Sequence, residues 1–228
     1  GLSYNHERFL SYGLNPLKKI IISSFDNEYF PKSRNIRQLV FYLKYFVLIR
    51  ELLKESLNDI PDYLNEIIHY SGKAYTFLWG SIKESLLFNG NNESNLCDFD
   101  KYLNLFKYKF NNNGNELGGY SILKNKNIIM AMDVGSTPDK RYSENYQSGP
   151  LSFEAIYKGN KIICNSGYFQ NHRHKLNNIS KSSAAHSTLI LNDKSASAFK
   201  KKNGQNILEN ELKSFNKNIV FEKNFWSI

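Results

Sequence analysis

Histidine and arginine side chains gather in one short stretch of the sequence, at His172, Arg173 and His174, with Lys175 next to them. An arginine side chain can grip a carboxylate or a sulfate group through two parallel hydrogen bonds. The stretch therefore predicts a subsite for acidic groups. A basic loop that is only solvated explains the same residues, and the sequence by itself favours this second interpretation.

Two other side chains are of types that move protons. Tyr168 follows Gly167 at the start of a long irregular stretch, and His186 follows two alanines. A tyrosine can act as a base once its pKa of about 10 is lowered, and a histidine can do so near neutral pH. The alternative for His186 is a hydrogen-bonded residue that supports the loop. Tyr168 is one of 15 tyrosines and can be incidental.

Charge does not identify a partner. The formal net charge is +9 and the isoelectric point about 9.3, which suits nucleic acid, a lipid surface or an acidic polysaccharide. The lysines are spread evenly along the chain, as on a solvated surface. We expect no nucleic-acid partner, because the sequence has no helix-turn-helix, zinc-finger or stacked-aromatic strand signature.

Cysteine content and hydropathy exclude two further classes. Cys97 and Cys164 are too few for a disulfide framework, and we expect both to be buried thiols. No apolar run approaches the ~18 residues of a membrane span. The nearest, residues 42–53, is interrupted by charged side chains. The chain begins at Gly1 without a methionine, and we interpret it as a soluble fragment of a longer protein.

The first half of the chain has helical periodicity. Apolar residues from Ile36 to Leu57 follow a 3.6-residue spacing, and Ser33 or Asn35 is a suitable N-cap. Aromatic residues make this helix apolar nearly all round, so we expect it to be buried between neighbours. A second helix is expected after Pro61 and packs antiparallel to the first, because the connection between them is short. A third is expected over residues 99–110.

Strands and tight turns replace this pattern after about residue 115. We expect one hairpin from residues 119–123 and 128–134, and a second from residues 151–157 and 161–165. Further strands are expected at residues 187–191 and 219–222. Between them, residues 167–183 form the longest irregular stretch, and a loop of that length is often functional.

Three motifs in this half carry a resemblance to a known family. They are Leu151-Ser152-Phe153-Glu154, then residues 162–167 (Ile-Ile-Cys-Asn-Ser-Gly), then residues 183–191, which include His186. Their order and spacing resemble the heparinase II/III-like family, which reads H-A-D-x-L-S-F, D-x-G and R-S-T-x-x-H-N-T. The resemblance implies an α+β fold: the C-terminal part of an (α/α) toroid over residues 1–114, followed by an antiparallel β-sandwich over residues 115–228.

Function also follows from the resemblance. Members of the family cleave uronic-acid polysaccharides by β-elimination, in which a base removes the C5 proton while the adjacent carboxylate is neutralised. The catalytic residues implied here are His186, Gln147 and Tyr168. The implied substrate-binding residues are Asn165, His172, Arg173 and His174.

The family also tends to hold a metal, and this part of the match is incomplete. His186 occupies the place of one metal ligand, whereas Gln147 and Asn165 stand where the family has a histidine and an aspartate. A zinc ion is thus suggested by resemblance, but amides are poor zinc ligands. We therefore assign no metal site.

Two functions stay open at this point. The first is a polysaccharide lyase, active only in the full-length protein, because the catalytic helices of such toroids are largely missing here. The second is a non-catalytic carbohydrate-binding or envelope-assembly protein with the same fold, which the two amides favour. The resemblance suggests the periplasm or cell envelope.

Overall fold

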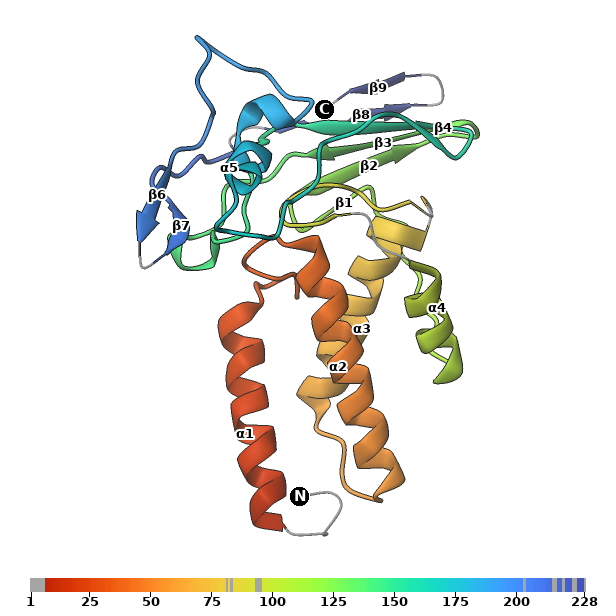
Figure 1. Ribbon diagram of the computed structural model, residues 1–228. Helices are drawn as coiled ribbons and strands as arrows, with labels where there is room; N and C mark the ends of the chain where they lie inside the picture. The colour runs from red at the N-terminus through yellow and green to blue at the C-terminus, as the bar shows by residue number, and fades with distance from the viewer. Residues whose placement is uncertain are drawn as a thin grey trace.

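The structure is a computed structural model that describes residues 7–80, 82, 84–92, 96–202, 204–214, 217–218, 220–222 and 225–227. Helices occupy its first part and antiparallel strands its second, so the chain has an α+β fold (Figure 1). The helices of the first part are α1 (Glu7–Ser24), α2 (Ile36–Glu55), α3 (Asp62–Tyr75), the π-helical turn η2 (Thr76–Gly80) and α4 (Leu96–Leu105).

The α2–α3 hairpin forms as the sequence predicts. Asn35 caps α2, because its side-chain oxygen accepts a hydrogen bond from the backbone N–H of Gln38 at 3.1 Å. Pro61 stands at the N-cap of α3, immediately before the helix begins. The two helices pack against each other and run in opposite directions (Figure 1). Their facing side chains begin the core, which includes Leu39, Leu43 and Leu64.

Two expectations for the helices are wrong. Helix α2 is not buried all round, since the side chains of Phe41 and Tyr45 are 56% and 44% exposed. Helix α4 ends at Leu105 rather than reaching residue 110, and the chain turns at Lys107, whose φ is +60°. Helix α1 was not predicted, and Pro16, a residue that usually ends a helix, lies inside it.

The main sheet is five-stranded and antiparallel, and its strands follow chain order. They are β1 (Glu116–Leu117), β2 (Tyr120–Lys124), β3 (Ile128–Asp133), β4 (Phe153–Tyr157) and β5 (Asn160–Ile163). Both predicted hairpins are confirmed. Lys158 and Gly159 both have positive φ in the turn between β4 and β5, as a tight two-residue hairpin turn requires.

Smaller elements follow the main sheet. They are helix α5 (Lys175–Lys181), the 3-10 turn η4 (Ser183–Ala185), and the strand pairs β6 (Phe199–Lys202) with β7 (Gln205–Leu208) and β8 (Val220–Glu222) with β9 (Phe225–Ser227). The 3-10 turn η3 (Lys140–Tyr142) lies between β3 and β4. The predicted strand near residue 219 is confirmed as β8.

The expected strand at residues 187–191 does not form. Asn192 and Asp193 both have positive φ, and only an isolated bridge joins Leu191 to Lys194. The stretch 167–183 is also not wholly irregular, because it contains α5. Cys164 is exposed rather than buried, since it follows the edge strand β5. The side chain of Cys97 lies outside the described residues.

One apolar core joins the helices to the sheet. Phe30, from the segment before α2, packs against Tyr120 of β2 with ring centres 5.9 Å apart, and Phe88 packs against the same ring at 5.6 Å. Ile122 and Ile156 extend the core into the sheet. The boundary between residues 114 and 115 stays a prediction. The shared core fixes the start of α2 against the loops of the sheet.

Candidate functional site

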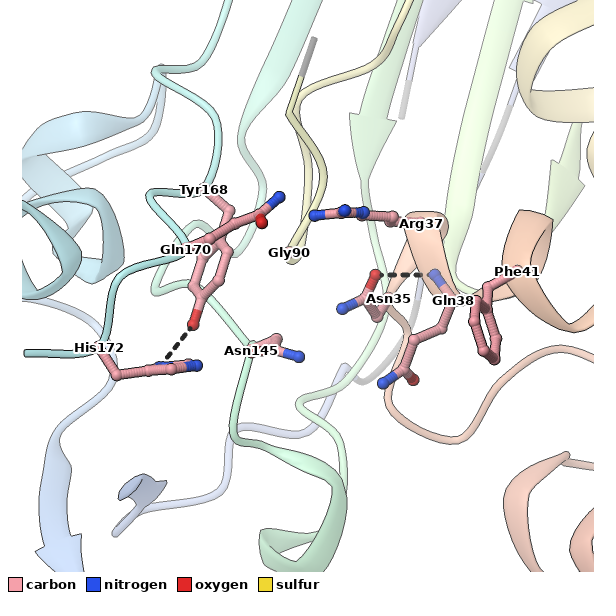
Figure 2. Close-up of a pocket in the computed structure, with 9 residues that line it drawn as sticks. All are labelled: Asn35, Arg37, Gln38, Phe41, Gly90, Asn145, Tyr168, Gln170 and His172. Carbon is pink, nitrogen blue, oxygen red and sulfur yellow. Dashed lines mark hydrogen bonds between the residues drawn. The ribbon is translucent and has the colours of Figure 1, made fainter. Parts of the chain in front are cut away.

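A cavity of about 340 Å³ lies between the start of α2 and the loops around the sheet (Figure 2). Most of the residues that line it have polar side chains, and the exposed ring of Phe41 lies among them. The lining residues are Asn35, Arg37, Gln38, Phe41, Gly90, Asn145, Tyr168, Gln170 and His172. Helix α2 thus supplies one wall of the cavity, and three loops supply the other.

A buried ion pair holds the helical wall in place. The guanidinium of Arg34, immediately before the N-cap of α2, lies 2.6 Å from a carboxylate oxygen of Asp133 at the end of β3. It also donates to the backbone oxygens of Gly119 and Ser136, both at 2.9 Å. Burial lowers the pKa of Arg34, but Asp133, Tyr120 and Tyr146 together outweigh this effect, so the pKa is raised. Arg34 therefore stays charged and fixes the start of α2 to the sheet.

The loop at Asn89 and Gly90 is fixed by the same group of residues. The amide of Asn89 donates to the Asp133 carboxylate at 2.8 Å and to the Tyr120 hydroxyl at 2.7 Å. Gly90 has a φ of +81°, and a β-carbon at that position would lie 2.3 Å from the Asn35 amide nitrogen. Only glycine fits this close approach of the loop to the helix cap.

Gln147 holds together the loops around the cavity. Its side chain is buried, accepts a hydrogen bond from the N–H of Gly90 at 3.0 Å, and donates to the carbonyl oxygens of Gly167 and Ser180 at 3.0 and 2.7 Å. Three segments of the chain therefore meet at one amide. The geometry gives Gln147 a positioning role, and the catalytic role expected from the sequence stays a prediction.

Tyr168 and His172 face the cavity as a pair. The Tyr168 hydroxyl lies 3.4 Å from Nδ1 of His172, and Nε2 of that ring lies 3.9 Å from the Glu144 carboxylate (Figure 2). Burial raises the pKa of Tyr168, the hydrogen bond with Asn177 lowers it, and the Glu144 charge raises it, so that the pKa is raised overall. This direction is opposite to the one that a tyrosine base needs. It suits a phenol that stays protonated and donates a proton.

His186 and Asn165 lie away from the cavity lining. Nε2 of His186 donates to the Ser180 carbonyl at 3.1 Å, the same oxygen that Gln147 uses. Burial lowers the pKa of His186, although the Ser180 hydrogen bond and the Asp133 charge oppose this effect. Asn165 is buried, with its amide nitrogen 3.3 Å from Glu154 and its oxygen accepting from the Ser187 N–H. Both side chains brace the loops, and their catalytic or substrate-binding roles stay predictions.

The basic cluster is split by the structure. His172 lines the cavity, whereas Arg173 is exposed and is not part of the lining. His174 caps α5, because its Nδ1 accepts a hydrogen bond from the backbone N–H of Leu176 at 3.2 Å. Only one member of the cluster therefore meets Tyr168 at the cavity.

The residues at the family's metal positions do not fit a metal ion. Gln147 and His186 both donate to the Ser180 carbonyl, so neither offers a lone pair to a common point through these nitrogens. Among the described residues, no three histidine, cysteine or acidic side chains gather closely enough to hold a metal. Hydrogen bonds connect the loops where the family uses a metal.

Sequence reasoning missed much of the helical wall. Arg37 and Gln38 follow the predicted cap Asn35, and Phe41 follows one turn later, so all lie on one end of α2. Polar residues at the start of an otherwise apolar helix were the available signal. Asp133 was assigned no chemistry, and nothing in its sequence context reveals Arg34 as its partner.

A comparison of the sequence with protein families matches residues 113–223 to the family described as heparinase II/III-like, C-terminal. These residues are similar to the C-terminal domain of that family. The resemblance seen in the three motifs is confirmed. No curated protein is similar enough in sequence to be counted as a relative.

Solved structures of similar fold extend the likeness into the helices. A crystal structure of heparinase III has a TM-score of 0.67 and 15% identity, over 86% of this chain. A heparan sulfate lyase from Pedobacter heparinus has a TM-score of 0.67 and 15% identity, over 89% of this chain. The heparinase-like chain spans 37% of the length of each. At this identity the likeness establishes the fold of the helices and the sheet together.

No helix in the described part of the heparinase-like chain is both long and apolar enough to cross a membrane.

Proposed function

We propose that the full-length protein is a polysaccharide lyase that cleaves a uronic-acid polymer by β-elimination at the cavity between α2 and the sheet loops. The observation that carries the proposal is the meeting of Arg37, Tyr168 and His172 at one cavity. A cation, a protonated phenol and an imidazole are the three groups that the elimination needs.

The groups divide the chemistry between them. Arg37 lies on the exposed end of α2, and no carboxylate among the described residues lies within ion-pair distance of its guanidinium. It is therefore free to bind the uronate carboxylate, which makes the C5 proton more acidic. The imidazole of His172 accepts that proton, and the electron pair of the C5–H bond forms the C4–C5 double bond. The C4–O bond breaks as the leaving oxygen takes a proton from Tyr168.

Polar and aromatic neighbours hold the sugar. The amides of Asn145 and Gln170 can hydrogen-bond sugar hydroxyls, and the exposed ring of Phe41 offers a flat apolar surface on the α2 side of the cavity (Figure 2). Gln147, His186 and Asn165 act through the loops that they brace. This assignment replaces direct catalysis by Gln147 with positioning.

The helices form the C-terminal part of an (α/α) toroid in this proposal, and the sheet region belongs to a β-sandwich. The heparinase III likeness supports this architecture, since it covers both halves. A longer chain would supply the rest of the cleft, so we expect the fragment to bind the polymer without cleaving it. The family resemblance favours action in the periplasm or cell envelope.

The decisive experiment measures unsaturated uronate ends by their absorbance. The full-length protein should produce them from heparan sulfate, heparin or alginate, and the 228-residue chain should not. Tyr168→Phe and Arg37→Gln in the full-length protein should each lower the rate about 100-fold or more. Tyr12→Phe, on the exposed side of α1, is the control and should leave the rate unchanged. Cleavage that persists in both cavity variants would place the chemistry elsewhere.

A non-catalytic carbohydrate-binding or envelope-assembly role is the second candidate. It is favoured by Gln147 and Asn165, because their side chains are fully engaged with the protein itself. Full-length protein that binds an acidic polymer, loses binding in Arg37→Gln and yields no unsaturated ends would establish it.

A further inference from the structure

The β6–β7 hairpin has two different faces. Lys181 of α5 is buried against one of them, where its ammonium lies 4.8 Å from the ring centre of Phe199 and donates to the backbone oxygen of Asn206 at 3.3 Å. Side chains alternate along a strand, so Lys201 shares this face with Phe199. The hairpin is thus attached to the rest of the protein through one side.

Lys200 and Lys202 lie on the other face, and Ile207 lies opposite Lys200 in the strand register. The turn η3 lies beside the edge of β7, because Ser143 at its end accepts a hydrogen bond from the N–H of Leu208 at 2.9 Å. The hairpin and the turn enclose a cavity of about 570 Å³, larger than the one at α2. It is lined by Lys140, Arg141, Lys200, Lys201, Lys202, Ile207, Leu208 and Glu209.

The positive charges of this cavity are largely unbalanced. Among the described residues, no carboxylate lies within 4.0 Å of the ammonium groups of Lys140, Lys200 or Lys202. Asp139 engages Arg141 at 3.1 Å and thereby fixes its direction. Glu209 is the one acidic side chain in the lining. Like charges held together repel one another, and an anion bound among them removes that repulsion.

We propose that this cavity is a second binding site for an acidic oligosaccharide, which we call the hairpin site. The proposal rests on the proposed function for the identity of the ligand. The hairpin site would hold a stretch of the polymer that is not being cleaved, through its carboxylate or sulfate groups. A polymer that is bound at the hairpin site is held at a high local concentration near the cavity at α2.

The lining fits a sugar better than a nucleic acid. Among the described residues, no aromatic ring lines the cavity, so unpaired bases would find no stacking surface. Ile207 offers an aliphatic surface to the C–H face of a sugar ring. Glu209 can accept hydrogen bonds from sugar hydroxyls.

The test measures binding of a heparin-derived octasaccharide to the protein by calorimetry. Lys140, Lys200 and Lys202 are changed together to glutamine, and the control changes Lys19, Lys109 and Lys126, which are exposed and lie on other elements. Both variants lose the same net charge. We expect the dissociation constant to rise about tenfold or more in the first and to stay within about twofold in the control. Binding by the first variant should also depend less on salt.

The alternatives give different results. Equal weakening in both variants would mean that net charge alone attracts the polymer, and would overturn the hairpin site. Equally tight, lysine-dependent binding of a single-stranded DNA 20-mer would overturn the assignment to a sugar. Far-ultraviolet circular dichroism verifies that both variants are folded. If the full-length protein cleaves the polymer and the first variant binds as tightly as the unchanged protein, only the hairpin site is rejected. If binding depends on the three lysines and the full-length protein produces no unsaturated ends, only the lyase is rejected.

Discussion

At the scale of single residues, the side chains expected to act in catalysis or in substrate binding differ in where they lie. Tyr168 and His172 face the cavity, whereas Gln147, Asn165 and His186 contact backbone groups of the loops. A histidine and two amides in the places of metal ligands have become a hydrogen-bonded support. The two groups should respond differently to substitution.

Gln147→Leu should destabilise the fold. The change leaves the buried Gly90 N–H without its acceptor and takes one donor each from the Gly167 and Ser180 carbonyl oxygens, which costs about 1–3 kcal/mol. Urea denaturation measures the free energy of unfolding. Gln205→Leu, at an exposed position of β7, is the matched control and should be nearly neutral. Equal effects in the two variants would remove the positioning role of Gln147.

His186 should make stability depend on pH on the acid side. Burial lowers its pKa in the folded state, so the unfolded chain takes up a proton first as the pH falls below about 6.5. The free energy of unfolding should therefore fall from pH 7 towards the lower folded pKa. His186→Gln should flatten this fall, whereas His69→Gln, on the exposed side of α3, should not. Parallel profiles for the three proteins would contradict the assignment.

At the scale of elements, local patterns predict what local forces determine. The α2 cap at Asn35, the hairpin turn at Gly159 and the two hairpins of the main sheet follow from neighbouring residues, and all are observed. The expected strand at residues 187–191 failed because the N–H and the hydroxyl of Ser187 both donate to the side-chain oxygen of Asn165 instead of joining a ladder. The family resemblance predicted the fold class correctly. It did not predict the α2 side chains that line the cavity, because they belong to none of the three motifs.

The junction of α2 with β3 depends on one ion pair. Arg34→Met leaves the Asp133 carboxylate buried without its cation, and this should cost about 3–5 kcal/mol. The double variant Arg34→Met with Asp133→Leu should recover much of that loss, because no uncompensated charge remains. Thermal unfolding measures both. Arg141→Met removes an exposed pair with Asp139 and should leave the midpoint unchanged. A harmless Arg34→Met would show that the apolar core alone fixes α2.

At the scale of the whole molecule, helices and sheet share one core, and the cavity lies along their boundary. The hairpin site lies at a separate place, beside the β6–β7 hairpin and η3. An acidic polymer would thus meet unpaired cations at two places on one molecule.

The fold should not depend on a metal ion. The side chains of Gln147 and His186 donate to the Ser180 carbonyl, and that of Asn165 bonds to Glu154 and Ser187, so removal of divalent metals takes no bond from the structure. Dialysis against excess EDTA should leave the thermal unfolding midpoint unchanged. A midpoint that falls on dialysis and returns with Zn²⁺ would show a metal site after all.

The Arg34–Asp133 pair also sets an order of events during synthesis. Its two residues stand 99 positions apart, and the other groups that Arg34 contacts follow residue 117. A ribosome makes the chain from its N-terminus, so α2 and α3 leave it well before Asp133 does. The start of α2 therefore has no ion-pair partner until Asp133 has been made, and the α2 side of the cavity is fixed in place only after β3 has emerged.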